Sequence, residues 1–202
     1  STLLRILGTL DVPDEGTVKI GGADIYGGGM KLSDKQLSEF RRRNIGFVYQ
    51  DYNLFPEYTA YENIVFPVHL DKRREDREEV TEIMERLGIE HCRDKFPFEM
   101  SGGEKQRVSL ARALVNKPAV ILADEATGNL DTRTSFEILV LFQKLHAEGR
   151  TIIFVTHNPE IAQYSSRNIR LRDGHVIEDT ANPEILSAAE ALAALPKNDE
   201  EG

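Results

Sequence analysis

Two short runs of apolar residues, 119–123 and 151–155, restrict the fold of this chain more than any other feature. Strands that are apolar along their whole length are typical of a parallel sheet that helices cover on both faces. The segment between the runs, residues 131–146, carries apolar side chains at helical spacing: Ile138, Leu141, Phe142 and Leu145. Strand, helix and strand in this order form a βαβ unit. We therefore expect an α/β fold with a mainly parallel sheet, in which both strands are buried on both faces.

The remaining patterns arrange the chain around this sheet. Strands are predicted at residues 17–20 and 45–49, a polar surface helix at 33–43, and a hairpin at 168–177 that turns at Asp173 and Gly174. Between residues 51 and 117 the pattern is mostly helical. The expected organisation is a core of residues 1–50 and 118–180, an inserted α-helical subdomain of residues 51–117, and a C-terminal helix with an acidic tail in residues 181–202.

Charge and composition exclude several classes of protein. The 25 basic and 34 acidic side chains give a formal net charge of −9, which disfavours broad attraction to nucleic acid or anionic lipid. No apolar run approaches the roughly 20 residues that span a bilayer. The single cysteine, Cys92, excludes an intrachain disulfide framework and a Cys-rich zinc site, and we expect an inert thiol there.

Other polar residues have simple structural interpretations. The mixed charges of residues 71–79 are expected on a solvated helix face. Four histidines have no partner pattern, and we expect them to be structural: His69, His91, His146 and His175.

Two carboxylates follow the first apolar run directly. Asp124 and Glu125 would lie at the carboxyl end of a strand, where ligands bind in open α/β sheets. Neighbouring side chains at a strand end diverge, so one carboxylate could hold Mg²⁺ while the other orients or deprotonates a water. For this pattern alone, a merely polar strand end is an equally good interpretation.

The run Ser101-Gly102-Gly103-Glu104 also has two interpretations. Ser followed three residues later by Glu is typical of a capping box at the start of a helix. Two glycines at the same helix start leave backbone N–H groups open to an anion, which the helix dipole favours. Alone the pattern is weak, but it becomes distinctive because Lys105-Gln106-Arg107 and Ala111-Arg112-Ala113-Leu114 follow it.

Taken together, these residues resemble the nucleotide-binding domain of an ABC transporter. Ser101 to Arg107 is similar to the ABC signature, with Met100 where Leu is usual and Glu104 where Gln is commoner. Residues 121–125 resemble the Walker B strand with its catalytic Glu, and residues 128–131 resemble the D-loop.

Two further positions complete the resemblance. Gln50 ends a strand as the Q-loop glutamine does, and His157 follows a strand as the switch histidine does. Five motifs in the family's order cover nearly the whole chain. The resemblance implies a P-loop NTPase core, which is RecA-like and has a mainly parallel sheet, with the α-helical subdomain inserted into it.

The first residues resemble the end of the Walker A motif, G-x-x-x-x-G-K-[ST]. In that loop, backbone N–H groups and the Lys hold the phosphates while the Ser or Thr hydroxyl binds Mg²⁺. Ser1 would be that hydroxyl and Thr2 would lie beside it, but the glycines and the Lys are not in this sequence. We interpret the chain as truncated inside Walker A. We expect the 202-residue chain to hold ATP poorly and to be inactive as an ATPase.

The resemblance implies that two such domains bind two ATP molecules between them, head to tail. Asp124, Ser1 and Gln50 would hold Mg²⁺, and Gln50 could instead reach the attacking water. Glu125 would be the catalytic base or a water-orienting carboxylate, and His157 would contact the γ-phosphate. Asp131 would bind ATP and communicate across the dimer. The other ATP-binding residues are Thr2 and the signature residues Ser101, Gly102, Gly103 and Glu104. Three roles have structural alternatives: a solvated Gln50, an N-cap at Asp131 and a structural His157.

Within the family, the pattern is closest to the branch of macrolide exporters and lipoprotein-release ATPases, although importing and cell-division relatives share much of it. The supporting stretches are residues 45–54, 123–131, 156–160 and 170–174, with Ala126 where the branch usually has Pro.

The implied partners are membrane-spanning transporter subunits and a second ATP-binding domain, with no nucleic acid. The implied location is the cytoplasmic face of the inner membrane. Phe55 and Tyr58, which we expect to be partly exposed, lie where the family docks its membrane subunit.

Two other functions stay open at this point. A degenerate, non-catalytic ABC module would explain the absent Walker A residues, although Glu125 and His157 argue against it. A soluble ABC ATPase that acts on DNA or ribosomes usually carries long insertions or a second cassette, which this chain does not show. The leading interpretation is an ATP-binding and hydrolysing subunit that couples dimerisation to export or extraction of a substrate by membrane subunits. The sequence does not identify that substrate.

Overall fold

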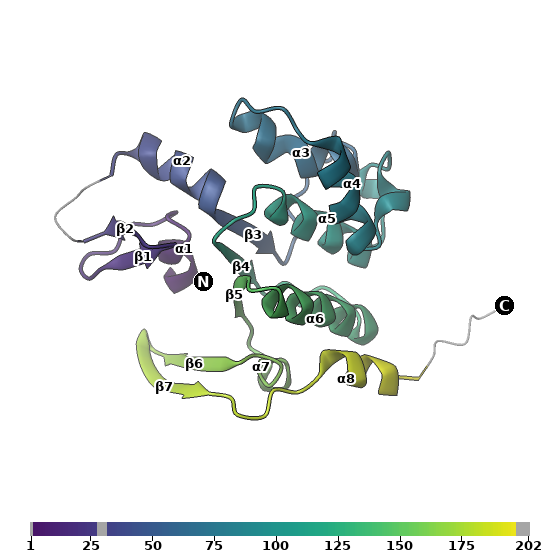
Figure 1. The fold of residues 1–202 in the computed structure, drawn as a ribbon. Coiled ribbons are helices and arrows are strands. Elements are labelled where there is room, and N and C mark those ends of the chain that lie inside the picture. Colours follow the sequence, from purple (N-terminus) through teal and green to yellow (C-terminus); the bar gives the residue numbers. More distant parts are fainter. Residues whose placement is uncertain (1, 28–31, 197–202) are drawn as a thin grey trace.

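Three parallel strands form the centre of the molecule. The computed structural model describes residues 2–27 and 32–196, so Ser1 and the end of the predicted acidic tail lie outside the described residues. The central strands are β3 (Ile45–Tyr49), β4 (Val120–Asp124) and β5 (Thr151–Val155), in the order β3-β4-β5 (Figure 1). Tyr49 pairs with Asp124, and Asp124 pairs with Val155, so the three carboxyl ends lie level. The predicted α/β class with a parallel sheet is confirmed.

The other elements surround this sheet. Before it come α1 (Thr2–Leu7), the antiparallel ribbon of β1 (Val18–Ile20) and β2 (Ala23–Tyr26), and α2 (Asp34–Asn44). The helix α6 (Thr132–Ala147) connects β4 to β5, and after β5 come α7 (Pro159–Ala162), the hairpin of β6 (Arg167–Arg172) and β7 (His175–Ala181), and α8 (Ala188–Ala194). In Figure 1, α8 lies next to α6, below the sheet. Within the described ranges, we find no helix with the length and apolar character needed to cross a bilayer.

The segment between β3 and β4 is helical, as predicted. It contains α3 (Ala60–Leu70), α4 (Arg77–Arg86), the 3₁₀ turns η1 (Glu90–Cys92) and η2 (Pro97–Glu99), and α5 (Gly102–Leu114). The helix α5 lies so close to β3 that a Cβ added at Gly46 would be 2.6 Å from the carbonyl oxygen of Ala113. Val108 of α5 and Ile121 of β4 belong to one buried apolar cluster, so the helical segment and the sheet share a core. The subdomain boundaries at residues 51 and 117 stay a prediction.

Two local predictions are confirmed in detail. Along α6, Ile138, Phe142 and Leu145 are buried, and Leu141 packs half-buried against the same core. The β6–β7 hairpin turns at residues 173–174, whose φ angles of 50° and 80° are both left-handed. A two-residue turn with two positive φ angles is the type that Asp-Gly favours.

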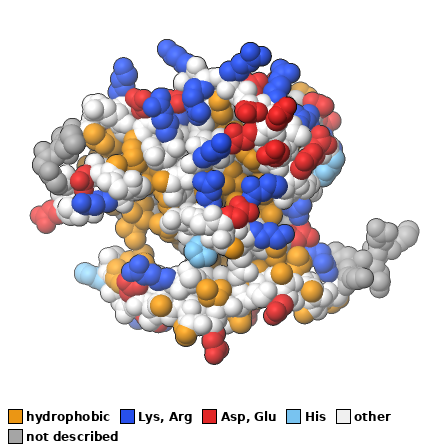
Figure 2. Space-filling model, in the orientation of Figure 1, with side chains coloured by type: hydrophobic (Ala, Val, Ile, Leu, Met, Phe, Trp, Pro, Cys, Tyr) orange, Lys and Arg blue, Asp and Glu red, His pale blue; other side chains and the backbone are white. Residues whose placement is uncertain are grey.

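The predicted burial on both faces is right for β4 and wrong for β5. The first four residues of β4 are buried, whereas β5 has no buried residue and Ile153 is 38% exposed. Among the described residues, β5 pairs with β4 alone and therefore forms an edge of the sheet. The apolar composition of a strand does not reveal whether a neighbour covers it. Other apolar side chains are visible at the surface on the left of Figure 2.

The run of residues 71–79 is largely exposed, as we expected, but it is helical only from Arg77, and Asp71 at its start is an exception to the solvation. Asp71 follows the end of α3, and its side chain is only 2% exposed. Arg43 and Arg73 donate to Asp71 Oδ2 at 2.8 and 3.0 Å, and Arg42 donates to Oδ1 at 3.0 Å. The hydrogen bond from Arg43, supported by that from Arg42, lowers the pKa of Asp71 although burial opposes it. Asp71 therefore ties α2 to the helical segment.

We predict that Asp71→Asn lowers stability at neutral pH and that the loss disappears in acid. The folded-state pKa of Asp71 is depressed, so its contribution is present above the unfolded pKa of about 3.9 and is lost as pH falls through the folded value. The measurement is the urea midpoint of both proteins from about pH 7 down to about pH 2, and the difference between them should shrink below about pH 4. The matched control is Glu82→Gln, which changes an exposed carboxylate on α4 and should leave the midpoint unchanged. Equal midpoints for the protein and Asp71→Asn at neutral pH would contradict this role.

Candidate functional site

The level strand ends bring the predicted site residues to one edge of the sheet. Gln50 follows β3, Asp124 ends β4 and is followed by Glu125, and His157 comes two residues after β5. The backbone N–H of Glu125 donates to the carbonyl oxygen of Val155 at 3.1 Å, which continues the pairing past β4. This is the carboxyl edge, where open α/β sheets bind their ligands.

Glu125 and His157 lie in direct contact at this edge. His157 Nδ1 is 3.2 Å from Glu125 Oε2, and the imidazole is 79% exposed. Glu125 has a φ of 47°, a left-handed conformation that is uncommon for a residue with a side chain. The chain turns immediately afterwards, since the N–H of Gly128 donates to the Glu125 carbonyl at 2.8 Å. A carboxylate and an imidazole in contact and open to solvent can together position a water and exchange a proton with it.

Gln50 contacts the segment that follows Glu125. Its Nε2 donates to Asn129 Oδ1 at 2.9 Å, and Asn129 Nδ2 donates to Asp51 Oδ1 at 3.0 Å. Gly128 makes room for this contact, because a Cβ at that position would lie 2.8 Å from Gln50 Nε2. The half-buried Gln50 amide is thus oriented by the same segment that carries the catalytic candidate Glu125.

Arg112 of α5 holds the segment after Gln50, and it has no counterpart among the predicted site residues. Its Nη1 donates to the carbonyl oxygen of Asn53 at 2.6 Å, and its Nη2 to that of Tyr52 at 2.9 Å. Tyr52 and Asn53 have φ angles of 61° and 48°, so these bonds fix a left-handed stretch of backbone. Burial lowers the pKa of Arg112 to about 10, which leaves it charged at neutral pH. The sequence feature that could have indicated this role is a charged residue between two small apolar residues, Ala111 and Ala113.

The predicted capping box at Ser101 is confirmed. The N–H of Glu104 donates to Ser101 Oγ at 3.2 Å, and the N–H of Ser101 donates to Glu104 Oε2 at 2.6 Å. Partial burial would raise the pKa of Glu104, but hydrogen bonds from Ser101 and from two side chains of η1 lower it well below its usual range. A Cβ at Gly103 would lie 2.6 Å from Thr134 Cγ2, so this helix start lies against α6. Capping and anion binding use different atoms of the same turn and are compatible.

Asp131 is the N-cap of α6, as its structural alternative predicts. Oδ1 accepts from the N–H of Thr134 at 2.9 Å, and Oδ2 accepts from the Thr134 hydroxyl at 2.6 Å. The hydrogen bonds from Thr134 lower the pKa of Asp131, which keeps the carboxylate ionised. A role for Asp131 between two domains stays a prediction.

The residues at the sheet edge fit a divalent cation and a phosphate group. Asp124 offers carboxylate oxygens and Gln50 an amide oxygen, which are the hard donors that Mg²⁺ prefers. His157 offers an exposed ring nitrogen that can contact a phosphate oxygen. Thr2 begins α1, while Ser1, the predicted hydroxyl ligand, lies outside the described residues.

Comparison with known proteins agrees with this geometry. The sequence profile of the ABC transporter family matches residues 1–128. The lipoprotein-releasing system ATP-binding protein LolD of Geobacter metallireducens is 44% identical over 182 residues, which cover 89% of this chain and 79% of LolD. The macrolide export ATP-binding/permease protein MacB of Rhodopirellula baltica is 43% identical over 184 residues, which cover 89% of this chain and 26% of MacB.

A solved structure has the same fold. The dimeric structure of a post-hydrolysis state of the ATP-binding cassette MJ0796, bound to ADP and Pi, matches with a TM-score of 0.76 and 38% identity. The match covers 90% of this chain and 79% of that one. The predicted P-loop NTPase fold is therefore confirmed. Because the family profile matches more than half of the residues and relatives align over most of the chain, this protein belongs to the ABC transporter ATP-binding family.

Proposed function

We propose that this chain is the ATP-binding and hydrolysing part of an ABC transporter, in which ATP-driven, head-to-tail dimerisation is coupled to the export or extraction of a substrate by membrane subunits. The observation that carries the proposal is the contact between Glu125 and His157, beside Asp124, at the carboxyl edge of the sheet. A left-handed Glu125 supports it, because backbone conformations of this kind concentrate at functional sites.

Each residue at the edge has a proposed task in phosphoryl transfer. Asp124 would hold Mg²⁺ together with Ser1 and Gln50, and the ion would supply charge stabilisation to the phosphates. Glu125 orients or deprotonates the attacking water. His157 contacts the γ-phosphate and fixes the Glu125 carboxylate, to which it is already paired. Positioning and charge therefore account for most of the proposed catalysis.

The second half of each ATP site is proposed to come from a second domain. The start of α5, with Ser101, Gly102 and Gly103, offers backbone N–H groups and the positive end of a 13-residue helix to a phosphate. Asp131 caps α6 beside this helix start, where Gly103 lies against Thr134, and would communicate between the two sites. The dimeric state of the relative MJ0796 supports this arrangement.

An aromatic cluster after Gln50 is the proposed contact for a membrane subunit. The ring centroids of Phe55, Tyr58 and Phe66 lie 4.6 to 5.7 Å apart, and Phe55 is 37% exposed while Tyr58 is half-buried. The expected partial exposure is confirmed. Arg112 is hydrogen-bonded to the backbone between this cluster and Gln50. A movement of the cluster can therefore be passed along this backbone to Gln50 at the sheet edge. The proposed contact would place the chain at the cytoplasmic face of the inner membrane.

We expect Glu125→Gln in the native full-length protein to lower ATP turnover by about 10²–10⁴-fold, because the side chain keeps its size but loses the base. The same variant should accumulate as an ATP-bound dimer, measured by sedimentation with ATP and Mg²⁺. The control is Glu148→Gln, at the opposite end of α6 from Asp131, which should change neither property. Wild-type turnover in Glu125→Gln would remove Glu125 from catalysis.

Nucleotide affinity should depend on the Walker A residues that this sequence does not contain. We predict that the 202-residue chain binds a fluorescent ATP analogue weakly, and that the same chain preceded by a Gly-Lys phosphate loop binds it about tenfold more tightly or better. Equal affinities would show that Walker A is not required. If the extended chain binds ATP without turning it over, the alternative of a non-catalytic module is favoured instead.

Substituting Phe55 or Tyr58 by Ala should uncouple transport from ATP hydrolysis. The two rings are proposed to contact the membrane subunit, so transport should fall when one is removed. Basal ATPase activity should be retained, because neither substitution changes a residue at the sheet edge. Transport and ATPase rates are measured together in vesicles that contain the complete transporter. The control is Ile185→Ala, an apolar side chain that is 48% exposed near the C-terminus. Unchanged transport would contradict the proposed contact.

A further inference from the structure

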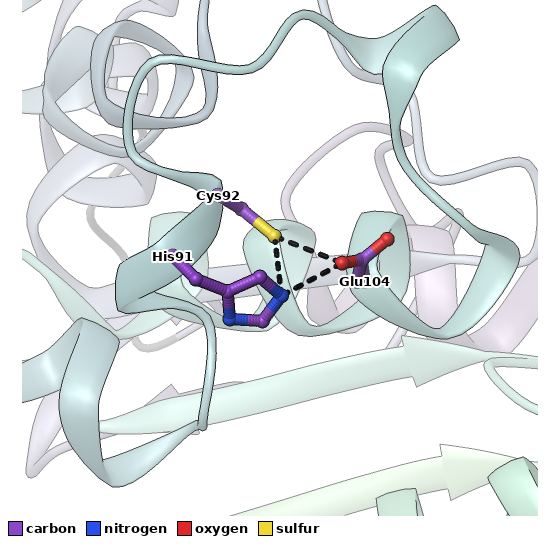
Figure 3. Close-up of side chains that lie close together, drawn as sticks. All are labelled: His91, Cys92 and Glu104. Atoms are coloured by element: carbon purple, nitrogen blue, oxygen red, sulfur yellow. Dashed lines mark hydrogen bonds and ion pairs between the residues drawn. The ribbon is translucent and has the colours of Figure 1, made fainter.

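Three metal-ligating side chains of different kinds meet beside the start of α5. His91 and Cys92 come from the 3₁₀ turn η1, and Glu104 comes from the first turn of α5 (Figure 3). His91 Nε2 lies 2.8 Å from Glu104 Oε1, while Cys92 Sγ lies 3.3 Å from that nitrogen and 3.2 Å from that oxygen. The sequence pattern gave neither His91 nor Cys92 a partner, and the structure brings both to Glu104.

The backbone and the capping box hold these three atoms together. The N–H of Cys92 donates to the carbonyl oxygen of Ile89 at 2.9 Å, which fixes the turn that carries the first two ligands. Glu104 is oriented by its other oxygen, Oε2, which accepts from the N–H of Ser101. The cap therefore leaves Oε1 directed at His91 and Cys92, and Figure 3 shows the three groups pointing toward one another.

We propose that His91, Cys92 and Glu104 form a binding site for a divalent cation of the zinc class. One thiolate, one imidazole and one carboxylate are a ligand set that suits Zn²⁺ and chemically similar ions better than Mg²⁺ or Ca²⁺. Bond lengths of about 2.0–2.3 Å to these atoms place tetrahedral ligands about 3.3–3.6 Å apart. The distance of 3.3 Å lies within this range and those of 2.8 and 3.2 Å are shorter, so side-chain rotations would admit an ion, with water as the fourth ligand.

The surroundings permit an ion to enter from one side. The His91 side chain is 59% exposed and that of Glu104 is 21% exposed, while Cys92 is buried, so an ion would reach the three atoms past His91. Lys95 Nζ lies 3.4 Å from Glu104 Oε1, and an incoming ion would displace this weak contact. On binding, the Cys92 thiol releases its proton to solvent, His91 takes the neutral tautomer in which Nε2 carries no proton, and both atoms donate lone pairs to the ion.

A bound ion would join η1 to the helix start that carries the ABC signature. Glu104 would then be a metal ligand through Oε1 and a cap through Oε2 at the same time. The site shares Glu104 with the signature helix start, but none of its ligands lies at the sheet edge, and its occupancy can be tested without nucleotide.

The test uses Co²⁺ as the probe, added to the chelator-treated full chain without nucleotide. We expect one equivalent to bind with a thiolate-to-cobalt charge-transfer absorption, and Zn²⁺ to displace it. Cys92→Ser should abolish this absorption. His91→Ala should weaken Co²⁺ binding by at least about 10–100-fold, the loss typical even for partners outside the ligand set.

Two further variants make the result decisive. His69→Ala is the matched control, since His69 also contacts a carboxylate, with Nε2 2.7 Å from Glu75 Oε2, and it should keep the absorption and the affinity. Glu104→Gln retains the shape of the cap and should weaken Co²⁺ binding. Circular dichroism checks the fold of Cys92→Ser, and the exposed His91→Ala decides the matter if the buried substitution does not fold. Absence of the thiolate band, or equal affinity in the parent protein and His91→Ala, would overturn the proposal.

Discussion

The level register of β3, β4 and β5 is the constraint on which the rest of the site depends. Tyr49, Asp124 and Val155 lie side by side, so the residues that follow them enter the same region of space. Successive side chains of a strand point to opposite faces, and a slip of one residue would send each to the other face. Glu125 and His157 come from segments more than thirty residues apart in the chain and still meet, because their strands end together.

Buried charged side chains that make several hydrogen bonds fix the segments around the sheet. Asp71 gathers Arg42, Arg43 and Arg73 and so fixes α2 against the helical segment. Arg112 performs a similar task nearer the site, where it holds two carbonyl groups of the segment after Gln50. In both cases an ionised side chain accepts or donates several charge-assisted hydrogen bonds, which compensate for its removal from water.

Local patterns predicted most of the fold and the order of the site residues. The apolar face of α6, the cap at Ser101 and the Asp-Gly hairpin depend on neighbours within one element, which the sequence displays directly. The exposure of β5, the burial of Asp71 and the cluster of His91, Cys92 and Glu104 depend on which distant segments come together. Period and composition carry no information about such partners, and for that reason these features were missed.

The two hydrogen bonds of Arg112 connect α5 to the backbone that follows Gln50. The helix is 13 residues long, which corresponds to about 20 Å. At its start lie Ser101 and Glu104, and near its end Arg112 grips the backbone that leads back to Gln50. Where binding at one of two such sites changes the affinity of the other, the coupling free energy is the same in both directions. A ligand at the start of α5 that changes the affinity of Gln50 for its own ligand therefore has its own affinity changed by the same factor.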